Sequence, residues 1–162
     1  MKKIGLISDT HNYLHPYIFQ IFQDVDMILH AGDICEQEIL ENLRTIAPVI
    51  AVRGNMDYYG STKVLPPLVT TKIEGLPVLI THDIGDIDKF HQKLISSSNF
   101  TPPQLILFGH THRARYQIKE GVIYINPGSA TSSRDSRKPS VMVIEIEDTE
   151  ITKHDLIELP EN

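Results

Sequence analysis

Two short segments of the chain each place a pair of candidate metal ligands two residues apart. Asp9 and His11 form the first pair, His110 and His112 form the second, and both pairs follow a short apolar run. On extended backbone, residues i and i+2 point to the same side, so each pair is expected to converge on one point. Carboxylate and imidazole groups suit borderline to hard divalent metals such as Mn²⁺, Fe²⁺, Ni²⁺ or Zn²⁺.

The first pair alone has a simpler interpretation, a turn in which Asp9 caps a helix and His11 is solvated. Three further strand ends argue against it, because each carries another candidate ligand: Asp33, Asn55 and His82. Ligands of open α/β sheets bind beyond the carboxyl ends of the strands, so these side chains are expected to meet at one edge. Seven ligands are too many for one tetrahedral ion. They suit two cations about 3.5–4 Å apart, bridged by a carboxylate such as Asp33.

Apolar periodicity indicates which elements would position these side chains. In the first half, strands alternate with amphipathic helices, which favours a parallel sheet with right-handed crossovers. The elements expected there are strands at 4–7, 27–29 and 49–52 and helices within 14–25 and 39–47. The second half is rich in strands, with hairpins expected at 69–81, 115–125 and 141–157, a strand at 105–108 and a helix capped by Asp86. Two packed sheets with helices outside would accommodate both halves in one domain, residues 1–162.

Composition is typical of a soluble globular protein and limits the partners. Hydrophobic residues make up 41% and charged residues 22% of the 162 positions, and no apolar run is long enough to cross a membrane. A single cysteine, Cys35, fits a reducing compartment, and without an apolar signal segment a cytoplasmic location is expected. The net charge of −6 argues against a general nucleic-acid surface. A homo-oligomer is compatible with the sequence.

Charge is unevenly spread along the chain. Residues 101–140 hold six basic and two acidic residues, whereas residues 141–162 hold seven acidic residues and one lysine. This distribution favours a solvated rim and an acidic terminal strand, and a basic edge beside a phosphate site is the alternative. The candidate cations for substrate charge are Arg53, Arg134 and Arg137.

The other four histidines and the cysteine are interpreted as structural. His15 and His91 lie on expected helices and His154 on the last strand, so surface positions are expected for all three. His30 is expected to be packed in the core, where it could hydrogen-bond a ligand. Cys35 is expected to be buried at the start of a helix.

The candidate ligands occur in motifs that resemble those of the calcineurin-like metallophosphoesterases. In that family's order, the motifs are Asp9-Thr10-His11, Gly32-Asp33, Gly54-Asn55-Met56-Asp57, His82 and Gly109-His110-Thr111-His112. The short chain and its Asn126-Pro127-Gly128-Ser129 segment resemble the small bacterial and archaeal phosphodiesterase branch. The resemblance implies an α/β (α+β) fold, a four-layer αββα sandwich of two mixed β-sheets flanked by helices.

The resemblance also implies a dinuclear site and its ligands. Asp33 would bridge the two metals, and the remaining ligands would be Asp9, His11 and His112 for one metal and Asn55, His82 and His110 for the other. The implied activity is that of a metal-dependent phosphodiesterase, in which a hydroxide between two divalent metals attacks the phosphodiester. Asn55 and His110 would also contact the phosphate. Mn²⁺ is the expected metal, and Ni²⁺, Fe²⁺, Zn²⁺ and Mg²⁺ are compatible.

Two positions depart from the family's pattern. Met56 stands where many members have a histidine thought to protonate the leaving group, and a thioether cannot donate a proton. Asp57, the usual partner of that histidine, is present, and Asp83 stands where glycine often occurs. The sequence therefore predicts a preference for diesters with good leaving groups. Residues 126–129 either line the site with backbone N–H groups or form an ordinary turn.

The alternative from another functional class is a non-catalytic interaction scaffold. The retromer subunit of eukaryotes resembles this fold and serves mainly as a protein-interaction platform with an altered metal site, whereas the ligand set here is intact. A nuclease is disfavoured, because the net charge is acidic and aromatic residues are not interleaved with basic ones. The expected partner is a small phosphodiester substrate, without a membrane and without a strong signal for nucleic acid.

Overall fold

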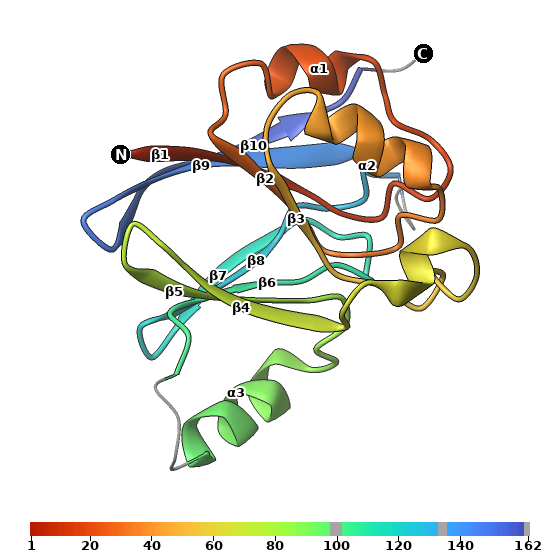
Figure 1. Ribbon diagram of the computed structural model, residues 1–162. Coiled ribbons are helices and arrows are strands. Elements are labelled where there is room, and N and C mark those ends of the chain that lie inside the picture. The colour runs from red at the N-terminus through yellow and green to blue at the C-terminus, as the bar shows by residue number, and fades with distance from the viewer. Residues whose placement is uncertain (98–101, 133–135, 161–162) are drawn as a thin grey trace.

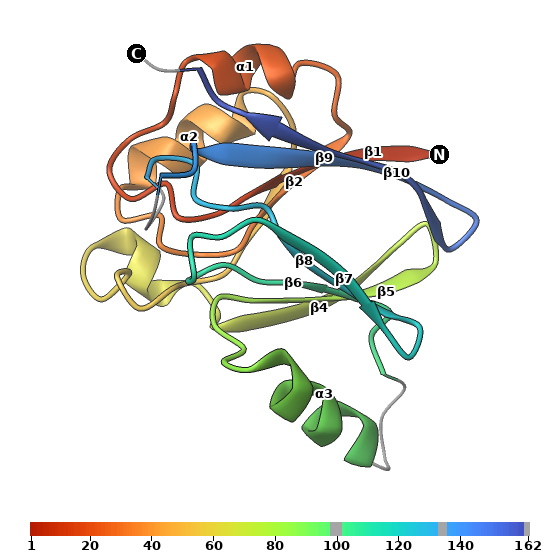
Figure 2. The ribbon, with the colours of Figure 1, turned by 180° about the vertical axis from the view of Figure 1, so that it is seen from behind.

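The computed structural model describes residues 1–97, 102–132 and 136–160. Its elements form four layers, in which two helices cover one sheet, a second sheet packs beneath it, and a third helix covers the far side (Figures 1 and 2). The αββα sandwich expected from the motifs is therefore confirmed. Arg134, one of the cations considered for substrate charge, lies outside the described residues.

The first sheet contains five strands in the order β10-β9-β1-β2-β3. Strands β1 (Lys2–Ile7), β2 (Met27–His30) and β3 (Val49–Ala51) are parallel, as the alternation of strands and helices predicts. Strands β9 (Ser140–Glu147) and β10 (Glu150–Glu158) form an antiparallel hairpin that adds to β1. The covering helices are α1 (Tyr17–Ile21) and α2 (Gln37–Arg44).

The second sheet also contains five strands, in the order β4-β5-β6-β8-β7. Strands β5 (Leu76–Thr81), β6 (Leu105–Leu107) and β8 (Val122–Asn126) are parallel, and β4 (Leu68–Ile73) and β7 (Arg115–Lys119) pair antiparallel at the two edges. Helix α3 (Ile87–Ser96) begins where the Asp86 side chain accepts a hydrogen bond from the backbone N–H of Lys89. A 3₁₀ helix (Ser61–Val64) lies within the expected loop before β4.

Three apolar clusters hold the four layers together. Along β1, Leu6 packs between the sheets while its neighbour Ile7 packs under α1 and α2, because successive side chains of a strand point to opposite faces. Both faces of the central strands are buried, which explains why the sequences of these strands are continuous apolar runs. The third cluster, between α3 and the second sheet, includes Phe108 and Tyr124.

Two histidines expected at the surface are buried, so that expectation was wrong. His15 accepts a hydrogen bond from the backbone N–H of Tyr17 at Nδ1, and its Nε2–H donates to the carbonyl of Pro160. His91 lies on the buried face of α3 and pairs with the hydroxyl of Tyr124 at 2.9 Å. His15 lies in the loop before α1 rather than on a helix. Helical periodicity does not reveal the burial of His91, because a histidine with a polar partner is tolerated on a helix face that packs against the rest of the protein. His154 is exposed, as expected.

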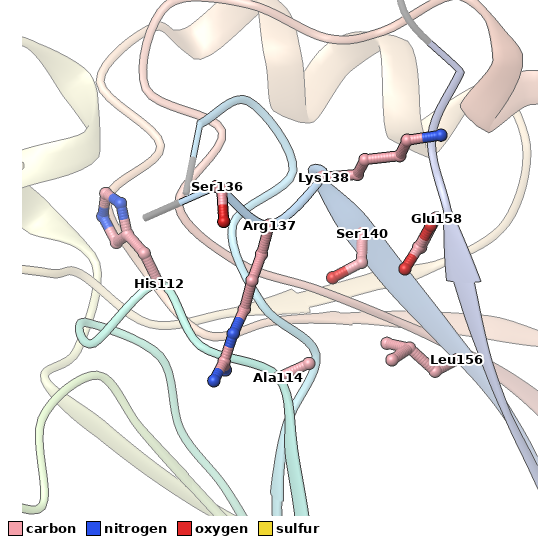
Figure 3. A pocket seen from close by; sticks show the side chains of 8 residues that line it. All are labelled: His112, Ala114, Ser136, Arg137, Lys138, Ser140, Leu156 and Glu158. Carbon is pink, nitrogen blue, oxygen red and sulfur yellow. The ribbon is translucent and has the colours of Figure 1, made fainter. Parts of the chain in front are cut away.

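The parallel strands of both sheets end at one side of the sandwich. There the loops that follow β1, β2, β3, β5 and β6 carry the candidate ligands. A hollow of 280 Å³ opens at this side, and Figure 3 shows His112, Arg137 and Glu158 among the side chains around it. None of the helices in the described parts of the chain is long and apolar enough to span a membrane.

His30 ends β2 and ties two of these loops together. Its Nδ1 accepts a hydrogen bond from the N–H of Gly32 (3.1 Å), and its Nε2–H donates to the Thr10 hydroxyl (3.0 Å). The side chain is fully buried, as expected, and its two nitrogens are occupied by these bonds rather than by a ligand. Burial lowers the pKa of His30 to about 4, so the imidazole is neutral near pH 7.

The lowered pKa of His30 predicts acid sensitivity. Between pH 6.5 and 4 the unfolded chain takes up a proton at this histidine that the folded chain does not, so the free energy of unfolding should fall by about 3 kcal/mol. Urea unfolding of chelator-treated protein from pH 7 to pH 4.5 should show this loss. His30→Gln should be less stable at pH 7 and lack this part of the pH dependence, whereas His154→Gln should retain it. An identical pH dependence in wild type and His30→Gln would contradict the assignment.

Candidate metal centre

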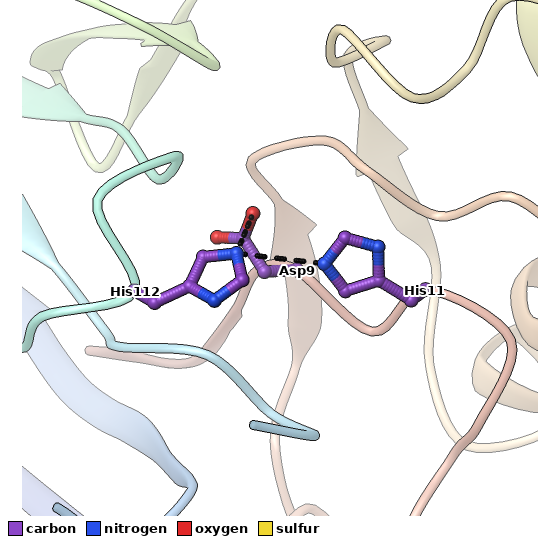
Figure 4. Close-up of side chains that lie close together, drawn as sticks. All are labelled: Asp9, His11 and His112. Atoms are coloured by element: carbon purple, nitrogen blue, oxygen red, sulfur yellow. Dashed lines mark hydrogen bonds and ion pairs between the residues drawn. The ribbon is translucent and has the colours of Figure 1, made fainter. Parts of the chain in front are cut away.

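Asp9, His11 and His112 form the first group of candidate ligands. One ligand atom from each lies within 4.8 Å of the others. The Nε2 atoms of the two imidazoles are 3.5 Å apart, and Nε2 of His112 is 3.3 Å from Oδ1 of Asp9 (Figure 4). These residues come from loops about a hundred positions apart, and Figure 4 shows both rings directed toward the carboxylate.

Asp33 and His82 form a second group, again together with Asp9. Nε2 of His82 is 3.3 Å from Oδ2 of Asp33 and 3.8 Å from Oδ1 of Asp9. The amide oxygen of Asn55 joins this group, at 3.0 Å from Nε2 of His82 and 3.1 Å from Nδ1 of His110. All seven residues expected from the sequence are thus brought together. Asp9 belongs to both groups, whereas the resemblance names Asp33 as the bridge.

The Asp9 carboxylate is the best test of whether a metal fits here. Its Oδ2 accepts hydrogen bonds from the Ser8 hydroxyl (2.7 Å) and the His110 N–H (3.2 Å). Its Oδ1 is buried and accepts no hydrogen bond within the described residues, although it faces two imidazole nitrogens. A buried oxygen without a partner costs free energy, and a cation among carboxylate and imidazole ligands would remove that cost. The donor set therefore fits divalent metal ions.

The tautomer of His82 also suits a metal ligand. Its Nδ1–H donates to the carbonyl of Ala31 (2.8 Å), so Nε2 is the nitrogen left to bind a metal, and it is directed toward Asp33. Metal-binding histidines commonly donate their other N–H in this way, because the bond fixes the orientation of the ring. The carbonyl of Ala31, directly after β2, thus positions the side chain of His82, directly after β5.

The carboxylates and imidazoles of the site shift each other's protonation. Burial raises the pKa of Asp9, but the nearby imidazoles of His112 and His82 outweigh it and lower that pKa below its usual value. Burial likewise raises the pKa of Asp33, and His82 together with the N–H of Met56 lowers it overall. Burial lowers the pKa of His82, whereas Asp33 and Asp9 raise it above its ordinary value. Both carboxylates are therefore held in the charged form that binds metals.

The backbone of the ligand loops corrects one expectation. Asp9, His11, Asp33, His110 and His112 all have left-handed backbone, with φ between 51° and 71°, so neither i, i+2 pair is extended. The paired side chains converge because the chain turns, not because it alternates. Left-handed backbone is costly for residues other than glycine and persists only where surrounding contacts hold it. No local sequence pattern indicated this conformation.

The glycines beside the ligands allow the loops to approach each other, as the motifs suggest. A Cβ atom on Gly109 would lie 2.0 Å from Oγ of Ser8, and one on Gly54 would lie 2.1 Å from Oδ1 of Asp33. Both distances are far shorter than a non-bonded contact. Any larger residue would therefore separate the loops that carry the ligands.

Asp57 has a structural role that the sequence did not reveal. Its buried carboxylate accepts hydrogen bonds from the N–H groups of Asp33, Ile34, Cys35 and Gly54, at 2.7–3.2 Å. It therefore holds the loop after β2 against the loop after β3. The sequence motif suggested only that Asp57 is the usual partner of a histidine, which Met56 replaces in this chain. A carboxylate within a loop, two residues past a candidate ligand, is the available signal for such a role.

Residues 126–129 form a bracing turn. The Asn126 side chain donates to the carbonyl of Gly109 and to the Thr111 hydroxyl, both at 3.0 Å, and it accepts from the N–H of Gly128. The Ser129 hydroxyl donates to the Asp9 carbonyl at 3.0 Å. The N–H of Gly128 is used within the turn and does not point to the site. For this residue the expectation of an ordinary turn therefore applies, rather than that of backbone N–H groups lining the site.

Four further residues that the sequence analysis singled out are also described by the structure. Met56 is 39% exposed, and its backbone N–H donates to Oδ1 of Asp33 at 2.8 Å. Burial raises the pKa of the Cys35 thiol to about 11, although Sγ lies 3.9 Å from Nδ1 of His11. Oδ2 of Asp83 is 3.6 Å from Nε2 of His110. Arg53 donates to the carbonyl of Lys63.

The chain is similar to known proteins in sequence and in fold. A sequence model of the calcineurin-like phosphoesterase superfamily domain matches residues 1–149. A probable metallophosphoesterase of Methanocaldococcus jannaschii is 34% identical over 155 residues, covering 90% of this chain and 76% of that protein. A phosphodiesterase of the same organism is 28% identical over 143 residues, covering 78% of this chain and 82% of that protein.

One solved structure with the same fold is wild-type Vps29 of Entamoeba histolytica, complexed with zinc. Its TM-score is 0.73 at 23% identity, over 97% of this chain and 98% of that one. At this identity the likeness concerns the fold alone. The sequence match covers most of the chain and includes all the ligand motifs, so the resemblance inferred from them is confirmed. The chain belongs to the calcineurin-like phosphoesterase superfamily.

Proposed function

We propose that this protein is a phosphodiesterase that depends on two divalent metal ions. The observation that carries the proposal is the buried Oδ1 of Asp9, which has no hydrogen bond within the described residues and faces imidazole nitrogens. The similarity to a phosphodiesterase of Methanocaldococcus jannaschii supports the same activity. The proposed substrate is a small phosphodiester.

The proposed ligands divide between the two metals as the motifs imply. Asp33 would bridge them, and the other ligands would be Asp9, His11 and His112 on one side and Asn55, His82 and His110 on the other. Two bound cations would lower the pKa of bound water toward about 7 and offset the negative charge of the phosphoryl oxygens. Mn²⁺ is the proposed metal, because the set combines imidazole, carboxylate and amide oxygen without a thiolate.

Side chains of the protein orient the substrate and keep the metal-binding carboxylates ionised. Asn55 and His110 lie at the exposed side of the ligand cluster, where they can contact a phosphoryl oxygen. The lowered pKa values of Asp9 and Asp33 keep both carboxylates available to metals at neutral pH. The Met56 side chain at the rim carries no proton for the leaving group. Catalysis should therefore depend on how well the leaving group departs as an anion.

Removal of one central ligand should abolish metal binding and activity together. Asp33→Ala should lose bound metal, measured by elemental analysis after dialysis against Mn²⁺, and its hydrolysis of bis(p-nitrophenyl) phosphate should fall by at least about a thousandfold. Asp24→Ala, which removes an exposed carboxylate paired with Lys3, should change neither quantity. Full activity of a chelator-treated, metal-free sample would refute the proposal. Failure to hydrolyse any phosphoester with metal supplied would favour the scaffold.

Met56 should limit the choice of leaving group. With Mn²⁺ or Ni²⁺, the wild-type protein should hydrolyse bis(p-nitrophenyl) phosphate much faster than unactivated alkyl monoesters. Met56→His restores a proton donor at the rim and should raise kcat for a diester with an alkyl leaving group by about 10²-fold, with little effect on p-nitrophenyl esters. Met56→Leu is the matched control without a donor. Faster turnover of alkyl monoesters by the wild-type protein would contradict this account.

A further inference from the structure

His11 directs one of its two ring nitrogens toward the other candidate ligands. Its Nε2 lies 3.5 Å from Nε2 of His112, within the group that Asp9 completes. Its Nδ1 lies on the opposite side of the ring, which Figure 4 shows facing away from His112. A neutral imidazole that binds a metal through Nε2 carries its proton on Nδ1, and such histidines commonly donate that N–H to a nearby acceptor. The partner of Nδ1 therefore influences how firmly His11 holds a metal.

The thiol of Cys35 is the partner of this nitrogen. Sγ of Cys35 lies 3.9 Å from Nδ1 of His11 and 4.0 Å from the carbonyl oxygen of Met56. A thiol accepts and donates weak hydrogen bonds, so this one can take the Nδ1–H and give its own S–H to Met56. Cys35 is buried, and a hydrogen bond shielded from water is electrostatically stronger than an exposed one. The sulfur thus connects the loops that follow β1, β2 and β3.

The backbone on both sides of this contact is fixed by hydrogen bonds. Cys35 has left-handed backbone, with a φ of 69°, and its N–H donates to Oδ1 of Asp57 at 2.7 Å. The N–H of His11 donates to the carbonyl of Asp33 at 2.9 Å. Left-handed backbone is costly for a residue with a Cβ atom and persists only where surrounding contacts hold it. The fold therefore maintains the thiol beside the imidazole at a cost in backbone strain.

We propose that Cys35 is a positioning residue for His11, whose Nδ1–H its sulfur accepts so that Nε2 stays directed toward Asp9 and His112. This role rests on the metal centre of the proposed function. It corresponds to the role of the Ala31 carbonyl beside His82. The buried Oδ1 of Asp9, which has no hydrogen bond within the described residues, belongs to the same ligand group and indicates where a cation would be needed. Partners of this kind typically contribute about 10–100-fold to metal affinity.

Two substitutions of Cys35 test whether its sulfur acts as a hydrogen-bond partner. Cys35→Ala removes the partner of Nδ1, whereas Cys35→Ser keeps a group that both accepts and donates. In calorimetric titrations of metal-free protein with Mn²⁺, Cys35→Ala should bind one ion about tenfold more weakly than wild type, and Cys35→Ser should recover most of that affinity. If Cys35 only filled space, the serine variant would bind no better than the alanine variant, because it buries a polar hydroxyl. Equal affinity of wild type and Cys35→Ala would overturn the proposal.

The tautomer of His11 gives a second readout, which wild-type protein alone provides. In the Zn²⁺-loaded protein, heteronuclear NMR should show His11 protonated at Nδ1 and metal-bound at Nε2. The Nδ1–H should exchange with water faster in Cys35→Ala than in wild type or Cys35→Ser. Metal binding through Nδ1 would overturn the proposal. So would a thiolate-to-metal absorption band in the Co²⁺-loaded wild-type protein, since Sγ would then be a ligand itself.

These measurements separate the role of Cys35 from the phosphodiesterase function. If Mn²⁺-loaded wild type hydrolyses bis(p-nitrophenyl) phosphate while Cys35→Ala binds Mn²⁺ as tightly as wild type, the positioning role is overturned and the phosphodiesterase stands. If the tautomer and the affinity difference are as expected but no phosphodiester is hydrolysed, the activity is overturned. The role of Cys35 at the metal centre is then supported.

Discussion

Burial of the Asp9 carboxylate is the constraint on which the rest of the site depends. One oxygen is held by Ser8 and the N–H of His110, and the other faces imidazoles without a hydrogen bond inside the described structure. A polar atom buried in this way costs about 1–3 kcal/mol, so the fold must supply that stability elsewhere. The result is a site that is ordered by the protein and electrostatically incomplete without a cation.

The energy that holds this arrangement comes from groups that are not ligands. The left-handed backbone of the ligand loops costs of order 1–3 kcal/mol per residue. Asp57 offsets part of it by binding four N–H groups of two loops, and Asn126 and Ser129 bind the carbonyls of Gly109 and Asp9. Beneath these loops, the parallel strands are clamped between two apolar layers. Rigid loops on a rigid sheet edge allow ligands from distant segments to meet with fixed geometry.

Basic side chains of this acidic protein gather beside the candidate ligands. The basic residues between positions 101 and 140 were interpreted as a solvated rim, with a basic edge beside a phosphate site as the alternative. The structure places two of them, Arg113 and Arg115, around a hollow of 350 Å³ beside His110 and another, Arg137, around the hollow beside His112.

The sequence alone determined the layers of the fold and the identity of the candidate ligands. Apolar runs, helical spacing and turn residues are local signals, and they indicated the helices, the hairpins and the parallel strands of the first sheet. Polar residues with ligand chemistry at successive strand ends indicated the site for the same reason, since strand ends share one edge of a sheet. The motifs then indicated the superfamily.

Tertiary structure decided how those ligands are held. The left-handed turns at Asp9 and His110, the four bonds of Asp57 and the burial of His15 and His91 have no local signature. Each depends on contacts between distant segments: Asp57 reaches 24 positions back to Asp33, and Ser129 reaches 120 positions back to Asp9. Such contacts exist only once the strands have assembled, because neither partner constrains the other in the unfolded chain.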